Sequence, residues 1–129
     1  MRNVETPLAP RPGGHYSQAV IHNGTVYVAG QLPIDPEHPE APPGDAAAQA
    51  YRALQNVRRI LEAAGSGLDR VVQMTVYVSD ISHWGEVNRV YAEVLGDHRP
   101  ARAVVPVRDL HHGYLIEIQA IAALGEEAP

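Results

Sequence analysis

The 129-residue sequence has no cysteine, no phenylalanine and only 5% aromatic residues. Without cysteine the chain has no disulfide, no thiolate metal ligand and no thiol nucleophile. Its 10 Lys and Arg residues form no basic stripe, and a net charge of -5 argues against nucleic-acid binding. No apolar run is long enough for a membrane span, and no segment has the composition of a signal peptide, so we expect a cytoplasmic protein.

The residues that are present suffice for one hydrophobic core. A chain of this length with 45% hydrophobic residues has the size of one domain, so residues 1–129 are predicted to form a single domain. Residues 1–12 carry three prolines and no periodicity, which predicts a flexible or extended arm that ends at Gly13-Gly14.

The first half of the chain predicts a hairpin followed by a helix. Asn23-Gly24 separates two β-prone runs, and this dipeptide is the strongest short hairpin signal because a type I′ turn needs two positive φ angles. A proline-rich surface loop is expected over 32–43. Asp45 is then predicted to cap a helix whose apolar residues recur every three or four positions until Gly65.

The second half predicts a strand over 71–78, with Val72, Met74, Val76 and Val78 on its covered side. Ser82 is predicted to cap a second helix that ends at Gly96. Strands over 99–107 and 115–123 complete the chain. The expected fold class is therefore α+β, with a mixed sheet of about five to six strands and two helices packed on one face.

The other face of this sheet is predicted to be too apolar for water, so we expect a homo-oligomer that closes over it, with polar residues lining clefts between subunits. The expected members of this face are Gln73, Thr75, Tyr77, Arg102, Val104, Glu117, Gln119 and Ile121.

Arg102 is the candidate binding residue that the pattern itself singles out. Its guanidinium is always charged, and an unpaired buried charge costs several kcal/mol. Glu117 in the last strand would make an internal ion pair with it, or else Arg102 binds an acidic ligand, and the residues alone leave both alternatives open.

The histidines give a weaker signal. His15 is expected in an exposed loop, although a role in proton transfer stays open. His111 and His112 are adjacent, so in a strand they would point to opposite faces; they are expected to be solvated or to border a cleft that favours acidic ligands. Neither pattern has the convergent spacing of a metal site, and we predict none.

Several segments together resemble the reactive intermediate imine/enamine deaminase (RidA, or YjgF) family, in the same order and over nearly the whole chain. The matching segments are Gly14–Ala19, Val28–Pro36, Gln55–Val57, Leu61–Gly65, Thr75–Asp80, Pro100–Arg102 and Ile116–Ala122.

The resemblance implies a chorismate-mutase-like fold, a homotrimer, and cofactor-free hydrolysis of small 2-imino or enamino acids to 2-keto acids and ammonia. It also implies that Arg102 holds the substrate carboxylate in a cleft between subunits. Tyr16, Gly30 and Gln31 would border that cleft.

Two positions depart from the pattern of the family that the chain resembles. Ala29 replaces a serine whose hydroxyl lies near the ligand, and Gln119 replaces a glutamate that holds the attacking water. Gln119 can orient a water but cannot accept its proton. Glu117 shares its face and is the candidate substitute, or else a partner for a basic residue across the trimer. The alternative function is a catalytically weak member that binds a small carboxylate as a sensor; a ribonuclease role finds no support.

Overall fold

Local sequence signals account for most of the elements in the computed structural model, which describes residues 1–125. The turn residues Asn23 and Gly24 have φ of 51° and 74°, so the predicted hairpin is confirmed. The side chain of Asp45 accepts a hydrogen bond of 2.9 Å from the backbone N–H of Ala48, and Gly65 has φ of 86° just beyond the helix, so both predicted ends of this helix are also confirmed.

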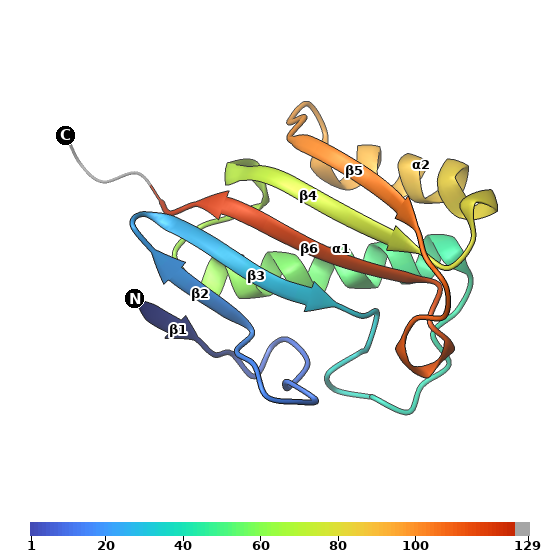
Figure 1. The fold of residues 1–129 in the computed structure, drawn as a ribbon, viewed down its shortest axis with the longest axis horizontal. Coiled ribbons are helices and arrows are strands. Elements are labelled where there is room, and N and C mark those ends of the chain that lie inside the picture. Colours follow the sequence, from blue (N-terminus) through green and yellow to red (C-terminus); the bar gives the residue numbers. More distant parts are fainter. Residues whose placement is uncertain (126–129) are drawn as a thin grey trace.

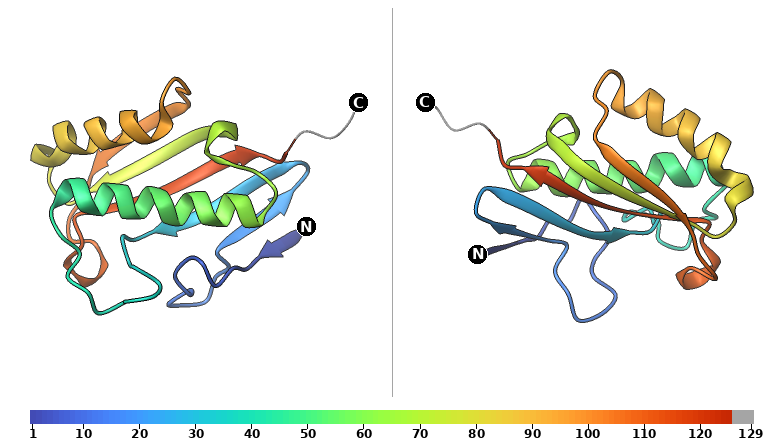
Figure 2. Two further views of the ribbon diagram at one scale, coloured as in Figure 1. Left: turned by 180° about the vertical axis from the view of Figure 1, so that it is seen from behind. Right: turned by 45° about the horizontal axis from the view of Figure 1, so that its top comes forward.

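The described chain forms a six-stranded sheet with two helices on one face (Figures 1 and 2). The strand order is β1-β2-β3-β6-β4-β5; β4 and β5 are parallel and the other pairs are antiparallel. None of the helices within residues 1–125 is long and apolar enough to cross a membrane. The elements are β1 (Arg2–Val4), β2 (Ala19–His22), β3 (Thr25–Gln31), α1 (Ala46–Ala63), β4 (Val71–Val78), α2 (Trp84–Leu95), β5 (Ala101–Pro106) and β6 (Ile116–Ala123).

The hydrophobic core lies between the sheet and the two helices. Alternate residues of β6 point into it, because successive side chains of a strand face opposite sides. Helix α1 contributes the largest set of buried side chains, among them Leu54, Val57, Ile60 and Leu61. The predicted α+β class with both helices on one face is therefore confirmed.

The start of the second helix differs from the prediction. Asp80, and not Ser82, is the capping residue: its carboxylate accepts a 2.8 Å hydrogen bond from the Ser82 N–H and opens a 3₁₀ turn over Ile81–His83. Helix α2 follows directly from that turn and ends at Gly96, where φ is 63°. Asp80 and Ser82 are both good capping residues, so composition alone does not separate them.

Two predictions about which face a residue occupies are wrong. An irregularity between Val71 and Gln73 in the β4–β6 pairing buries Val71 and leaves Val72 56% exposed. In addition, Arg102 pairs with the buried Met74, and Val104 pairs with the buried Val76. Paired residues in a sheet point to the same side, so Arg102 and Val104 face the helices and not the open face.

Residues 1–12 were predicted to form a flexible or extended arm, and the structure shows the extended alternative at its start. Residues 2–4 form β1 and pair with β2. Beyond β1, the buried side chain of Gln18 accepts a 2.7 Å hydrogen bond from the Thr6 N–H and donates to the carbonyls of Thr6, Ala9 and Pro10. One amide side chain thus fixes the path of the segment that leads into the loop before β2.

Candidate functional site

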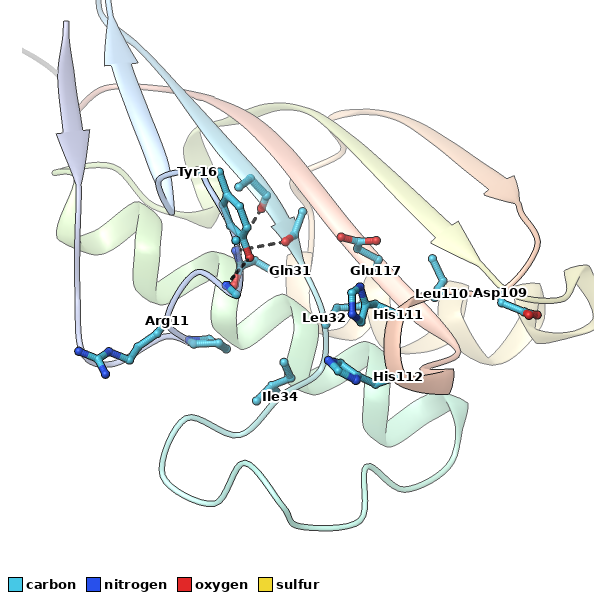
Figure 3. A pocket seen from close by; sticks show the side chains of 15 residues that line it. Arg11, Tyr16, Gln31, Leu32, Ile34, Asp109, Leu110, His111, His112 and Glu117 are labelled. Carbon is cyan, nitrogen blue, oxygen red and sulfur yellow. Dashed lines mark hydrogen bonds between the residues drawn. The ribbon is translucent and has the colours of Figure 1, made fainter.

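A cavity of about 590 Å³ lies where β3 ends and β6 begins (Figure 3). Three connecting segments complete its wall: the loop between β1 and β2, the start of the loop between β3 and α1, and the loop between β5 and β6. Its lining residues are Pro10, Arg11, Gly13, Gly14, Tyr16, Ala29, Gly30, Gln31, Leu32, Ile34, Asp109, Leu110, His111, His112 and Glu117. Five of the residues predicted from the sequence, Tyr16, Ala29, Gly30, Gln31 and Glu117, therefore meet at one place.

The carboxylate of Glu117 lies directly over the backbone of Gly30. A Cβ atom at Gly30 would collide with Oε2 of Glu117 and would lie 3.1 Å from its Cδ. With Glu117 in this place, position 30 therefore has no room for a side chain. Partial burial raises the pKa of the Glu117 carboxyl above its ordinary value, and the positive charge of His111 partly opposes this rise in pKa.

Backbone irregularity at the end of β3 shapes the wall next to Glu117. The β3–β6 pairing shifts between Val28 and Gln31, as at a β-bulge. The Gln31 side chain is 4% exposed and donates to the carbonyls of Ala29 (3.1 Å) and Gly30 (3.4 Å). Gln31 thus holds the bulged backbone in place.

Tyr16 stands on the opposite wall of the cavity from the two histidines (Figure 3). Its hydroxyl accepts a hydrogen bond of 3.1 Å from the Gly13 N–H, and the residue is 52% exposed. The ring therefore has a fixed position and an uncovered face. His15, its neighbour in sequence, is not among the lining residues.

His111 and His112 both line the cavity, so the expectation that they point to opposite faces is wrong. They belong to a 3₁₀ turn and not to a strand, and His112 has a left-handed φ of 59°. Their ring centroids are 4.2 Å apart. The left-handed conformation of His112 was not foreseeable from its residue type.

Gln119 and Arg102 lie outside this cavity. Gln119 is on the open face of the sheet, where its Oε1 accepts a 3.2 Å hydrogen bond from the Tyr77 hydroxyl. Among the two polar residues of β6, Glu117 is thus the one that reaches the cavity.

Arg102 lies against helix α2. Its Nη1 donates a 2.9 Å hydrogen bond to Oδ1 of Asn88, and its guanidinium carbon is 4.7 Å from the ring centroid of Tyr91 and 5.8 Å from that of Trp84. Such cation–π contacts favour a charged guanidinium without neutralising it. Within residues 1–125 no carboxylate lies within 4.0 Å of this group. The internal ion pair with Glu117 is therefore not formed.

The sheet keeps Arg102 and Glu117 of one chain apart. Glu117 pairs with Tyr77, which pairs with Val105, so the two residues are two strands apart and three residues out of register. At about 4.8 Å per strand and 3.3 Å per residue, this displacement is roughly 14 Å. The side chains also leave the sheet on opposite faces. One chain by itself cannot bring both groups to one small ligand.

Comparison with known proteins places these features in a family. A model of the endoribonuclease L-PSP family matches residues 6–124. A RutC family protein from Pyrococcus abyssi is 45% identical over 92% of this chain and 94% of its own length, and a rat protein named 2-iminobutanoate/2-iminopropanoate deaminase is 43% identical over 95% and 89%. The crystal structure of RidA from an Antarctic Psychrobacter superposes with a TM-score of 0.91 at 40% identity, covering 96% of this chain and all of the other.

Proposed function

The chain belongs to the endoribonuclease L-PSP family, which includes the RidA and imine deaminase proteins just compared, and on that premise we propose that it hydrolyses small 2-imino or enamino acids to 2-keto acids and ammonia. The observation that carries this proposal is the carboxylate of Glu117, half-buried at the wall of a cavity that also presents the exposed ring of Tyr16.

Glu117 is the proposed base. Water adds to the C=N carbon while Glu117 accepts one of its protons, and the nitrogen, protonated in turn, leaves as ammonia when the carbonyl forms. A carboxyl whose pKa is raised by burial is a better proton acceptor and donor near neutral pH than an exposed one. We give Glu117 the water-holding role predicted for Gln119, because the Gln119 amide oxygen is already bound to Tyr77 outside the cavity.

Arg102 is the proposed anchor for the substrate carboxylate, and it comes from a neighbouring subunit. A planar guanidinium binds a carboxylate through two parallel hydrogen bonds, and Arg102 has no acidic partner within residues 1–125. Since one chain holds Arg102 and Glu117 on opposite faces, a substrate that touches both must lie between two subunits.

A ring of three subunits provides such sites. The edge strand β5 and α2 of one subunit would cover the open sheet face of the next, and this head-to-tail contact closes on itself after three copies. The open face carries Tyr27, 47% exposed, on β3 and Ile121 on β6, which pair with each other. Burial of this apolar surface would stabilise the trimer.

The other lining residues shape the site in this proposal. Tyr16 packs its ring against the substrate, and Gly30 leaves room for the Glu117 carboxylate. Gln31 fixes the backbone at the end of β3, next to Glu117. The Ala29 methyl group contributes an apolar surface to the cavity wall. These groups position the imine carbon near Glu117, and positioning is a large part of catalysis for a reaction that also proceeds in water.

The test is the rate of imine disappearance in competition with a trapping nucleophile. A flavin amino-acid oxidase makes 2-iminobutanoate from L-2-aminobutanoate, and semicarbazide traps the imine that remains. The wild-type protein should reduce semicarbazone formation, and Arg102→Ala should abolish this effect. No rate above that of buffer with several 2-imino acids would refute the proposal. Thermal stabilisation by a 2-keto acid without turnover would instead select the sensor alternative.

A further inference from the structure

The conformation of the loop before β6 turns two consecutive histidines toward one cavity. His112 has φ of 59° and Gly113 has φ of 73°, so two left-handed residues follow each other. A left-handed backbone is uncommon for a residue with a Cβ atom, and it is found at sites where the surrounding structure enforces it. The Tyr114 ring supports this arrangement, with its centroid 6.2 Å from that of His112 in an edge-on contact.

The result is a pair of imidazoles inside the cavity wall. Their ring centroids are 4.2 Å apart and the rings are tilted by 53°. In Figure 3 both rings point into the cavity, and His111 lies next to the Glu117 carboxylate. Two imidazoles this close can donate two N–H groups to one ligand, and when protonated they repel each other unless an anion lies nearby.

The other charged side chains of the cavity wall do not approach the space in front of the histidine pair. Besides Glu117, the charged lining residues are Arg11 and Asp109. Figure 3 shows that the guanidinium of Arg11 and the carboxylate of Asp109 both point away from the histidine pair. Leu32 and Ile34 line the cavity near the two rings and offer no hydrogen-bond donor side chain. On this side of Glu117, the two imidazoles are therefore the side chains that can donate hydrogen bonds to a ligand.

We propose that His111 and His112 bind an acidic group on the side chain of the substrate, so that the preferred substrates are 2-imino acids with a second carboxylate. This inference rests on the proposed function. The first carboxylate binds Arg102 of the neighbouring subunit, the imine carbon lies at Glu117, and the side chain extends to the histidine pair. The bound carboxylate accepts one hydrogen bond from each ring.

Two imines of nearly equal shape test this preference. The oxidase products of L-glutamate and L-glutamine differ in one terminal group, a carboxylate or an amide. The wild-type protein should hydrolyse the glutamate imine with a kcat/KM about tenfold higher, as expected for a charge-assisted hydrogen bond.

The double variant His111→Gln/His112→Gln should lower this ratio to about one, and the ratio, not the rate with either imine alone, is the readout. The matched control is His22→Gln, which changes an exposed histidine of the β2–β3 hairpin, at the opposite end of β3 from the cavity. This variant should leave the ratio unchanged. An equal rate for both imines in the wild-type protein, or a ratio that survives the double variant, would overturn the inference.

A binding measurement separates this inference from the proposed function. Calorimetric titration with 2-oxoglutarate and with the uncharged-chain analogue 2-oxopentanoate requires no turnover. The inference predicts tighter binding of 2-oxoglutarate, again by about tenfold, and loss of this difference in the double variant. If no imine is hydrolysed but this difference is seen, the proposed function fails and the histidine subsite stands. If imines are hydrolysed and both acids bind equally, the subsite alone is refuted.

Discussion

Replacing Gly30 with alanine would put a methyl group where the Glu117 carboxylate now lies. The added Cβ would overlap Oε2 of Glu117 and would lie 3.1 Å from Cδ and 3.3 Å from Cγ. Ordinary contacts between nonbonded carbon atoms begin at about 3.5 Å. The carboxylate must therefore shift by roughly 1 Å or rotate away, and a misplacement of about 1 Å in a catalytic group costs about a hundredfold in rate.

The expected phenotype of Gly30→Ala is a folded protein with a rate reduced about a hundredfold. Gly30 has no left-handed φ, so alanine adds no backbone strain there. The imine-trapping assay measures the rate, and thermal unfolding checks the fold. Gly13→Ala is the matched control, because it adds the same methyl group at the cavity edge with no atom within 4 Å of it, and it should retain most of the activity. A Gly30→Ala variant as active as the wild type would refute the assignment of Glu117.

Three further predictions concern the anchor, the base and the ordered N-terminal segment. Arg102→Ala should raise KM far more than tenfold, by well over about 1.4 kcal/mol, so that no hydrolysis is detected in the trapping assay, and Arg102→Lys should recover little because lysine lacks the planar fork. Because burial raises the Glu117 pKa above 4.5, and His111 only partly opposes it, the folded state binds this proton more tightly. The free energy of unfolding should therefore fall as pH rises from 4.5 through the raised pKa, and Glu117→Gln should remove that slope in denaturant titrations. Gln18→Ala should cost about 1–3 kcal/mol in stability and speed hydrogen exchange at residues 6–10, whereas unchanged exchange would contradict its role.

The parts of the fold that were predictable from the sequence depend on neighbouring residues. Asn23-Gly24 specifies a turn by its backbone preferences, and Asp45 and Gly65 delimit α1 by capping chemistry. Each signal acts over about four residues. The same logic fails at Ser82, because Asp80 offers an equally good cap two residues earlier.

The face that Arg102 occupies could not be predicted in this way. It depends on pairing with β4, which is set by residues far away in sequence, and a shift of one residue reverses the face. The irregularity between Val71 and Gln73 shows how such a shift arises without a clear sequence signal.

The choice between Glu117 and Gln119 has a similar cause. Both residues lie on one face of β6, so the strand pattern does not distinguish them. The cavity selects Glu117 because the bulge at the end of β3 and the loop carrying His111 meet there. Likewise, the path of residues 6–10 depends on four hydrogen bonds from the single side chain of Gln18.

Mixed oligomers of two inactive variants test most directly whether Arg102 and Glu117 act from different subunits. Arg102→Ala and Glu117→Gln proteins would be unfolded together, refolded in equal amounts and assayed for imine hydrolysis. Random assembly predicts that roughly a quarter of the sites combine an intact Arg102 with an intact Glu117 from a neighbour, and the activity should return to about that fraction of wild type. If both residues act within one chain, no subunit of the mixture is complete, and an inactive mixture of correctly assembled oligomers would contradict the account.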